Sequence, residues 1–291
     1  RITSTPHLYF LNRDLIMTIA TRHGLIIDRK KQRQRKVWLF LALFGVVSLM
    51  LYVYQKSSYP KPTMESRVDT LCDDQTICVT VAFIPRGTHL LDNSEWISVN
   101  ADYWLTTHEV TQLQWDVVMG TNPSYFSRCG QQCPVENVSA KDALLFIDRL
   151  NDLLGGQKFR LPTESEWIYA ATSHAKPDLY VKSEHGWKIN SLYGWLSDRE
   201  ELRTHPVGQL ESTGYHLYDL MGNVREWVLH DCALHRPWWK VILQTEDCGQ
   251  RYITLGGSFI DYPGFARPEV RYHEPTEKAY DVGFRLALSA Q

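Results

Sequence analysis

The sequence lacks the short motifs of several common enzyme classes. It has no Gly-x-Ser-x-Gly elbow, no His-Glu-x-x-His pair, no P-loop and no Gly-x-Gly-x-x-Gly segment after a strand. His108-Glu109 begins like a zinc-protease motif, but the second histidine is missing. The main body of the chain also lacks a basic excess, because the net charge is -2 and the basic surplus lies near the amino end. A nucleic-acid-binding surface is therefore not expected.

Cysteine is absent from the first part of the chain, and all six cysteines follow residue 71. An even number confined to one part of the chain favours disulfides and export to an oxidising compartment. Proximity in sequence favours three pairs: Cys72–Cys78, Cys129–Cys133 and Cys232–Cys248. The first two spacings do not match those of zinc sites, whereas His230 and His235, which flank Cys232, leave a metal site as the alternative there.

Charge is absent from residues 37–54, where Ser48 is the one polar interruption. At 1.5 Å per residue this segment would extend about 27 Å as a helix, enough to cross the hydrocarbon core of a bilayer. The basic run at residues 29–36 precedes it, so the positive-inside rule places the amino end in the cytoplasm. A cleaved signal peptide is the alternative, but no small-x-small cleavage site follows.

These features predict four regions. Residues 1–36 form a basic cytoplasmic tail, residues 37–54 a transmembrane helix, residues 55–69 a Ser- and Pro-containing linker, and residues 70–291 an exported domain. Met17 is a more ordinary first residue than Arg1. The expected location is the cytoplasmic (inner) membrane, spanned once, with the carboxyl-terminal domain in the periplasm.

The exported domain has the composition of a packed α+β fold with long loops. Strand-like segments occur at residues 79–85, 96–109, 252–255 and 282–287. Three helices are predicted: one near residue 111 with Thr111 or Glu109 near its cap, one after Ser139 with Asp142 three residues later, and one after Thr163 with Glu166 three residues later. Gly155 and Gly156 end the second helix. Residues after 173 show little periodicity, which is typical of ordered loops around a small sheet.

Seven segments, in order, carry a family resemblance. They are Met119–Phe126, Cys133–Ser139, Arg160–Ala171 (RLPTESEWIYAA), Pro206–Gly208, Leu217–Trp227 (LYDLMGNVREW), Gly256–Phe259 and Asp281–Arg285. Together they resemble the formylglycine-generating enzyme, or sulfatase-modifying factor, family over roughly residues 79–288. The resemblance implies an α+β, C-type-lectin-like, loop-rich fold, here preceded by one transmembrane helix. Trp167, Trp227, Phe284 and Arg285 are expected in the core.

The resemblance also implies where a copper site would lie. Catalytic members hold copper through two cysteine thiolates after the Gly-Gly-Ser-aromatic motif, because Cu(I) prefers sulfur ligands. Counting in the same way from Gly257-Ser258-Phe259 reaches Asp261 and Ala266. No copper is therefore expected, and the chain is predicted not to be an enzyme. The related iron-dependent sulfoxide synthases use histidines of an additional helical domain that this chain lacks.

Two further kinds of site follow from the resemblance. Calcium is expected at Asn223, Val224 and Glu226, with a second site near Asn190 and Ser191 that Asp198, Glu200 or Glu201 would complete. Charged and aromatic residues of the family's substrate cleft are candidates for binding a peptide or small ligand, or else form a solvated loop: Asp261, Arg267, Glu269, Arg271, Tyr272 and His273.

The leading hypothesis is a non-catalytic, membrane-anchored periplasmic binding or regulatory protein that acts through protein–protein contacts at the cell envelope, in a secretion or signalling complex. That role rests on analogy with the family. One alternative is a formylglycine-generating-type oxidoreductase that acts on a protein cysteine with a rearranged site. Another is a receptor for a peptide or a glycan. No nucleic-acid partner is expected.

Overall fold

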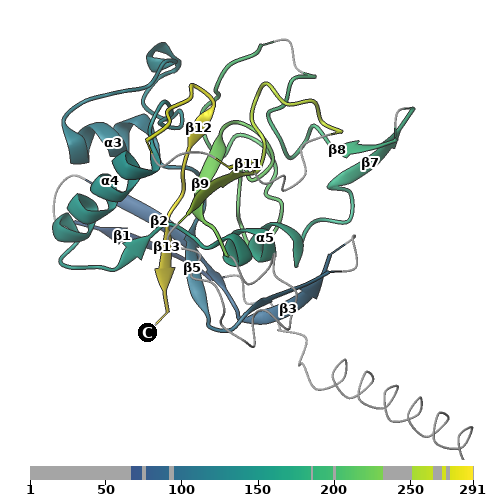
Figure 1. Cartoon of the computed structure of the whole chain (residues 1–291), viewed down its shortest axis with the longest axis horizontal. Coiled ribbons are helices and arrows are strands. Elements are labelled where there is room, and N and C mark those ends of the chain that lie inside the picture. Colours follow the sequence, from purple (N-terminus) through teal and green to yellow (C-terminus); the bar gives the residue numbers. More distant parts are fainter. Residues whose placement is uncertain are drawn as a thin grey trace, which may run out of the picture. The chain divides into compact units, whose positions relative to one another are not determined.

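A computed structural model describes residues 67–73, 77–91, 95–184, 186–198, 201–231, 251–264, 271–272 and 276–290 (Figure 1). The predicted tail, the predicted transmembrane helix and nearly all of the linker lie outside these ranges. Within the ranges, every helix is too short or too polar to cross a bilayer. The described part lies in one compact unit, Met64–Gln291.

The larger sheet has five strands in the order β1-β2-β5-β13-β6, all antiparallel to their neighbours. Their bounds are β1 Val68–Cys72, β2 Cys78–Ile84, β5 Tyr103–Thr106, β13 Ala287–Ser289 and β6 Phe159–Arg160. Cys72 and Cys78 are cross-strand partners in the β1–β2 pair and form a disulfide there, as predicted. The last strand of the chain thus lies in the middle of the sheet, between β5 and β6.

In the described ranges three α-helices and one 3-10 turn accompany the sheets: α3 Gln112–Met119, η1 Ser127–Cys129, α4 Ala140–Leu153 and α5 Glu164–Thr172. The predicted helix starts are confirmed, because Thr111, Ser139 and Thr163 each cap a helix in a capping box. Gly155 and Gly156 follow α4 with φ of 70° and 82°, in the left-handed region where glycine is favoured.

The smaller sheet has four strands in the order β11-β10-β9-β12, and β12 runs parallel to β9. The strands are β9 Arg225–Leu229, β10 Tyr252–Leu255, β11 Arg271–Tyr272 and β12 Val282–Gly283. Two hairpins complete the fold: β3 Gly87–Leu90 with β4 Trp96–Val99, and β7 Tyr180–Ser183 with β8 Gly186–Ile189. The fold is therefore α+β with mixed sheets and few helices, as predicted.

Two of the predicted strands were too long. Residues 96–109 form β4 and β5, which belong to different sheets, and a turn near Asp102 separates them. Residues 282–287 likewise contain β12 and the start of β13, again in different sheets. In both cases a short connection that contains polar residues carries the chain from one sheet to the other: Asn100 and Asp102 in the first, and Arg285 in the second.

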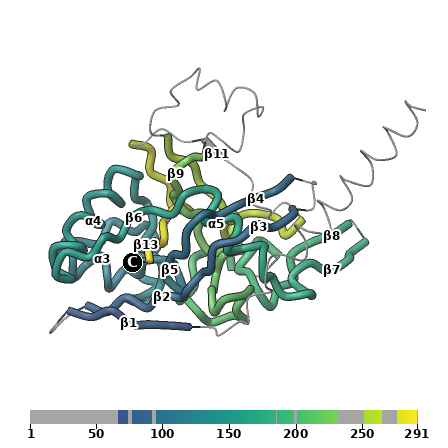
Figure 2. The backbone as a smooth tube through the Cα atoms, turned by 90° about the horizontal axis from the view of Figure 1, so that it is seen from below, coloured from purple at the N-terminus to yellow at the C-terminus, as the bar shows by residue number. Residues whose placement is uncertain are grey.

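The hydrophobic core lies on both faces of the five-stranded sheet. Along β2, Val79 and Val81 point to a cluster that contains Phe146 and Leu150 of α4, whereas Ala82 and Ile84 point to a cluster that contains Trp167 of α5. Figures 1 and 2 show α3 and α4 on one side of the sheet and α5 on the other. Strand alternation thus distributes one strand's side chains between two cores.

One buried arginine joins the two sheets. Arg285, between β12 and β13, is fully buried and donates from Nε and Nη2 to the Glu226 carboxylate at 2.6 and 2.7 Å. It also donates to the backbone oxygens of Thr106 on β5 at 3.1 Å and Tyr218 at 2.8 Å. Trp167 Nε1 donates to Glu226 at 2.6 Å. The predicted core positions of Trp167, Trp227, Phe284 and Arg285 are confirmed.

Replacing this arginine should strongly destabilise the domain. In Arg285→Met the Glu226 carboxylate stays buried without its cation, which typically costs about 3–5 kcal/mol. Urea unfolding of the purified chain measures the free energy of unfolding. The matched control is Arg203→Met, because Arg203 pairs with Glu201 at the surface and should change little. Equal effects of the two substitutions would contradict the assignment.

Candidate binding face

Four aromatic rings from three separate loops form a continuous cluster, here called the aromatic face: Tyr125, Phe126, Phe259 and Tyr280. Tyr125 contacts Phe126 and Tyr280 at centroid distances of 5.0 and 5.8 Å, and Phe126 contacts Phe259 at 5.3 Å. Phe259 is buried, but Tyr125 is 71% exposed and Tyr280 46% exposed. Large aromatic side chains held together at the surface are typical of contact sites.

Next to the aromatic face lies a cluster of charged side chains. Two of its members are adjacent in sequence to ring residues: Ser258 precedes Phe259, and Asp281 follows Tyr280. Arg225, at the start of β9, is buried and pairs with Asp261 and Asp281. Ser258 supports both carboxylates, with its hydroxyl 3.0 Å from an oxygen of each, and its backbone N–H donates to Asp261 at 2.8 Å. Two carboxylates thus share one guanidinium. The cluster carries a net negative charge when both are ionised.

Asp261 is one of the two residues at the positions of the expected copper thiolates. Its carboxylate is committed to Arg225 and Ser258, so the position holds an ion pair. Ala266 lies outside the described residues. The other candidates for ligand binding stay predictions. The backbone of Arg271 and Tyr272 forms β11 beside Thr254 and Ile253, whereas Arg267, Glu269 and His273 lie outside the described ranges.

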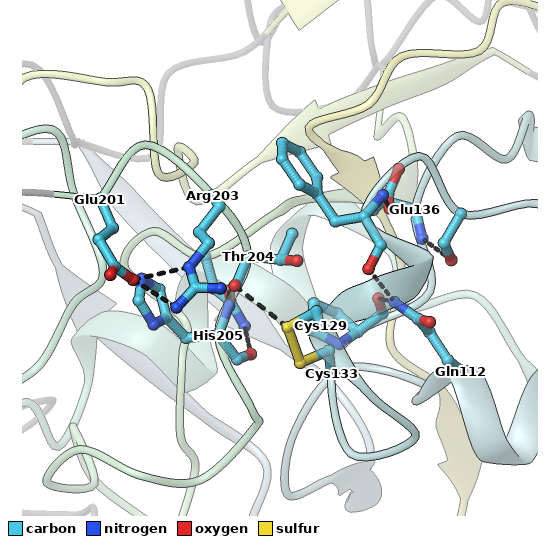
Figure 3. The surroundings of a disulfide bond; sticks show 12 residues. Gln112, Cys129, Cys133, Glu136, Glu201, Arg203, Thr204 and His205 are labelled. Atoms are coloured by element: carbon cyan, nitrogen blue, oxygen red, sulfur yellow. Dashed lines mark hydrogen bonds and ion pairs between the residues drawn. A yellow bond between two sulfur atoms is a disulfide. The ribbon is translucent and has the colours of Figure 1, made fainter.

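A disulfide lies near the base of the aromatic face. The Cys129–Cys133 bond is present as predicted, and Cys129 Sγ lies 3.2 Å from the backbone oxygen of Thr204. Figure 3 shows the disulfide between Thr204 on one side and Glu136 and Gln112 on the other. The predicted Cys232–Cys248 bond and the metal alternative at Cys232 and His235 lie outside the described residues.

The residues predicted for calcium are already engaged by protein groups. Both oxygens of Glu226 accept hydrogen bonds from Arg285, and one also accepts from Trp167. The Asn223 side chain bonds the backbone N–H and oxygen of His205, and Asn190 bonds Asp178 and Leu192 in another loop. A calcium ion bound through the Glu226 side chain does not fit this arrangement. The described part of the chain contains no cluster of three or more metal-ligating side chains.

Close to the ion pair of Arg285 and Glu226, some buried carboxylate oxygens accept no hydrogen bond. Both carboxylate oxygens of Glu109 and Oδ1 of Asp219 have no hydrogen-bond partner. Burial raises the pKa of Glu109 well above its usual range, and the carboxylates of Asp219 and Glu226 raise it further. Burial likewise raises the pKa of Asp219 to about 6.

Calcium binding stays a prediction, which thermal melting with and without added calcium would test.

Reasoning from the sequence missed the residues that shape this face: Tyr125, Tyr280, Glu136 and Arg225. Tyr125 and Glu136 lie inside matched motifs, where they read as fold-determining residues. Arg225 offered a partial signal, because it is a charged residue within the matched motif Leu217–Trp227. A buried arginine needs an acidic partner, but Asp261 and Asp281 lie 36 and 56 residues away, so the sequence does not point to them.

Comparison with known proteins agrees with the fold. The chain is 29% identical over 205 residues to the chaperone protein LppX of Paenibacillus barcinonensis, covering 54% of this chain and 71% of that protein. It is 26% identical over 212 residues to the formylglycine-generating enzyme of Mus musculus, covering 64% of this chain and 51% of that enzyme. The chain therefore spans about half the length of the mouse relative.

Two solved structures share the fold. Treponema denticola variable protein 1 superposes with a TM-score of 0.60 at 23% identity, covering 77% of this chain and 99% of that one. PvdO from Pseudomonas aeruginosa gives 0.60 at 19% identity, covering 80% and 100%. The model of the sulfatase-modifying factor enzyme 1-like domain matches residues 72–290. The chain therefore belongs to the sulfatase-modifying factor, or formylglycine-generating enzyme, family.

Proposed function

We propose that this chain is a non-catalytic member of the family that binds a protein partner through the aromatic face. The observation that carries the proposal is the ion pair at Asp261. A carboxylate is a hard oxygen donor, whereas Cu(I) selects soft sulfur ligands. The Asp261 carboxylate is also already engaged by Arg225 and Ser258, which leaves it poorly placed to ligate a metal.

The exposed tyrosines support a protein-contact role. Tyrosine brings a large apolar surface and a hydroxyl to an interface at a low cost in side-chain entropy, and aromatic residues are enriched at binding hot spots. Tyr125 and Tyr280 are open to solvent while the rings beneath them are fixed by packing. The description of the Paenibacillus relative as a chaperone is consistent with action through binding.

The proposed setting is the periplasmic side of the cytoplasmic membrane. The uncharged segment 37–54 and the preceding basic run support a single span, and the two disulfides support an oxidising compartment. Membranes washed with alkaline carbonate should retain the full chain. A variant without residues 37–54 should be lost from them, and its retention would contradict the anchor.

Copper binding separates this proposal from the oxidoreductase alternative. The oxidised wild-type chain should take no Cu(I) from the chelator bathocuproine disulfonate, because neither Asp261 nor Ala266 supplies a thiolate. The double variant Asp261→Cys with Ala266→Cys is the matched control, and after reduction it should compete for about one equivalent of Cu(I). Equal competition by the wild type would sink the non-catalytic proposal.

Site-specific photocrosslinking tests the binding face directly. A benzoyl-phenylalanine placed at Tyr125 of the full chain, in intact cells, should give a discrete crosslinked species. The same probe at Leu145 is the control, because Leu145 is 46% exposed on α4 and does not belong to the aromatic face. The yield of the crosslinked species should fall at least about fivefold when Tyr280→Ala is added, as expected if the loss of a hot-spot side chain costs about 1 kcal/mol or more of binding free energy. Crosslinks of equal yield at both positions would argue against a specific face.

A further inference from the structure

The segment that carries Tyr125 and Phe126 is held in place mainly by side chains. Between α3 and α4 its only helical element is η1. Gln112 Nε2 donates to the backbone oxygen of Phe126 at 3.3 Å, and Asn137 Nδ2 donates to that of Pro123 at 3.0 Å. These bonds engage backbone oxygens and leave the N–H groups of Tyr125 and Phe126 to another partner.

That partner is Glu136, a fully buried carboxylate. Oε2 accepts from the Tyr125 N–H at 3.1 Å, and Oε1 accepts from the Phe126 N–H at 2.8 Å. Each carboxylate oxygen therefore fixes one of two consecutive peptide groups. Through these peptides Glu136 sets the positions of two rings of the aromatic face without touching a partner itself.

We propose that Glu136 is the positioning residue of the aromatic face, and that uptake of one proton by its carboxylate releases the Tyr125–Phe126 segment. An ionised carboxylate accepts both N–H groups. Once a proton from solvent is bound, one oxygen becomes a hydroxyl, a weaker acceptor that must also keep its proton clear of the N–H donor, so at least one of the two hydrogen bonds is weakened or lost. The consequence for partner binding rests on the proposed function, whereas the release of the segment does not.

The surroundings of Glu136 place this change near neutral pH. Burial is the largest effect and raises its pKa to about 7, and the Asp281 carboxylate also raises it, while the N–H groups of Phe126 and Tyr125 lower it. Asp281 is the charged group that acts on Glu136, and its own partner is Arg225. The packed rings of the aromatic face bring no charge.

Ionisation of Glu136 orders the aromatic face but lowers the stability of the whole fold. The raised pKa means that the stability contributed by Glu136 is complete below about pH 4.5, its ordinary value, and is lost as the pH rises through about 7. The ionised form above pH 7 is the one that holds both N–H groups. The aromatic face is thus best ordered where Glu136 costs the fold most.

Hydrogen exchange of the full chain in detergent tests the proposal. Deuterium uptake is followed by mass spectrometry in peptides covering residues 121–130 between pH 6 and 8, after correction for intrinsic exchange, with the α4 peptide as internal reference. At pH 8 the Tyr125 and Phe126 amides of the wild type should exchange about tenfold more slowly than at pH 6, as expected for a lost hydrogen bond. Glu136→Gln should exchange fast at both pH values, and Glu109→Gln should behave like the wild type.

The outcomes are separable. Protection of residues 121–130 that is independent of pH in the wild type would overturn the proposal, whether or not Glu136→Gln folds. Equal protection in the wild type and Glu136→Gln at pH 8 would overturn it as well. If protection titrates as expected but Tyr125 gives no specific crosslink at pH 8, the positioning role stands and the proposed function fails.

Discussion

The buried pair of Arg285 and Glu226 is the constraint on which the rest of the structure depends. The five-stranded and four-stranded sheets share no ladder hydrogen bonds, yet Arg285 bonds the β5 backbone on one side and the β9 carboxylate on the other. A fully buried guanidinium is tolerated only if its donors are satisfied. The chain must therefore bring Thr106, Tyr218 and Glu226 to one point, which fixes how the two sheets meet.

A second buried arginine, Arg225 at the start of β9, has a different role. Arg285 lies in the interior and pairs with Glu226, whose carboxylate also accepts a hydrogen bond from Trp167. Its role is therefore to stabilise the fold. Arg225 lies beside the surface rings and pairs with two aspartates, one of which occupies an expected thiolate position. The family's fold is therefore retained while an ion pair occupies one of the positions expected for a copper thiolate. The two ion pairs involve different residues, so a substitution in one leaves the other in place.

Local features were predictable from the sequence, whereas features that depend on distant partners were not. Thr111, Ser139 and Thr163 cap their helices through residues three positions away, so short-range patterns sufficed. The short polar segment Asn100–Asp102 separates β4 from β5, but which sheet each strand joins depends on distant partners. Arg225 meets Asp261 and Asp281 only after the chain has folded, and Glu136 reaches Tyr125 and Phe126 from the loop before α4. The motifs indicated the family and its fold, but the aromatic face arises from loops that the motifs do not connect.

The β1–β2 hairpin has a mechanical consequence. β1 is an edge strand that begins at Val68, within the last residues of the predicted linker 55–69, and Arg67 stacks its guanidinium over Trp104. Any force that enters the domain from its amino-terminal side therefore loads β1 first, and would peel it from β2 one residue pair at a time, starting at Val68 and Ala82. The disulfide between Cys72 and Cys78 lies at the opposite end of the β1–β2 pair. Peeling would stop at this covalent bond, and the load would then pass through it to Cys78 at the start of β2.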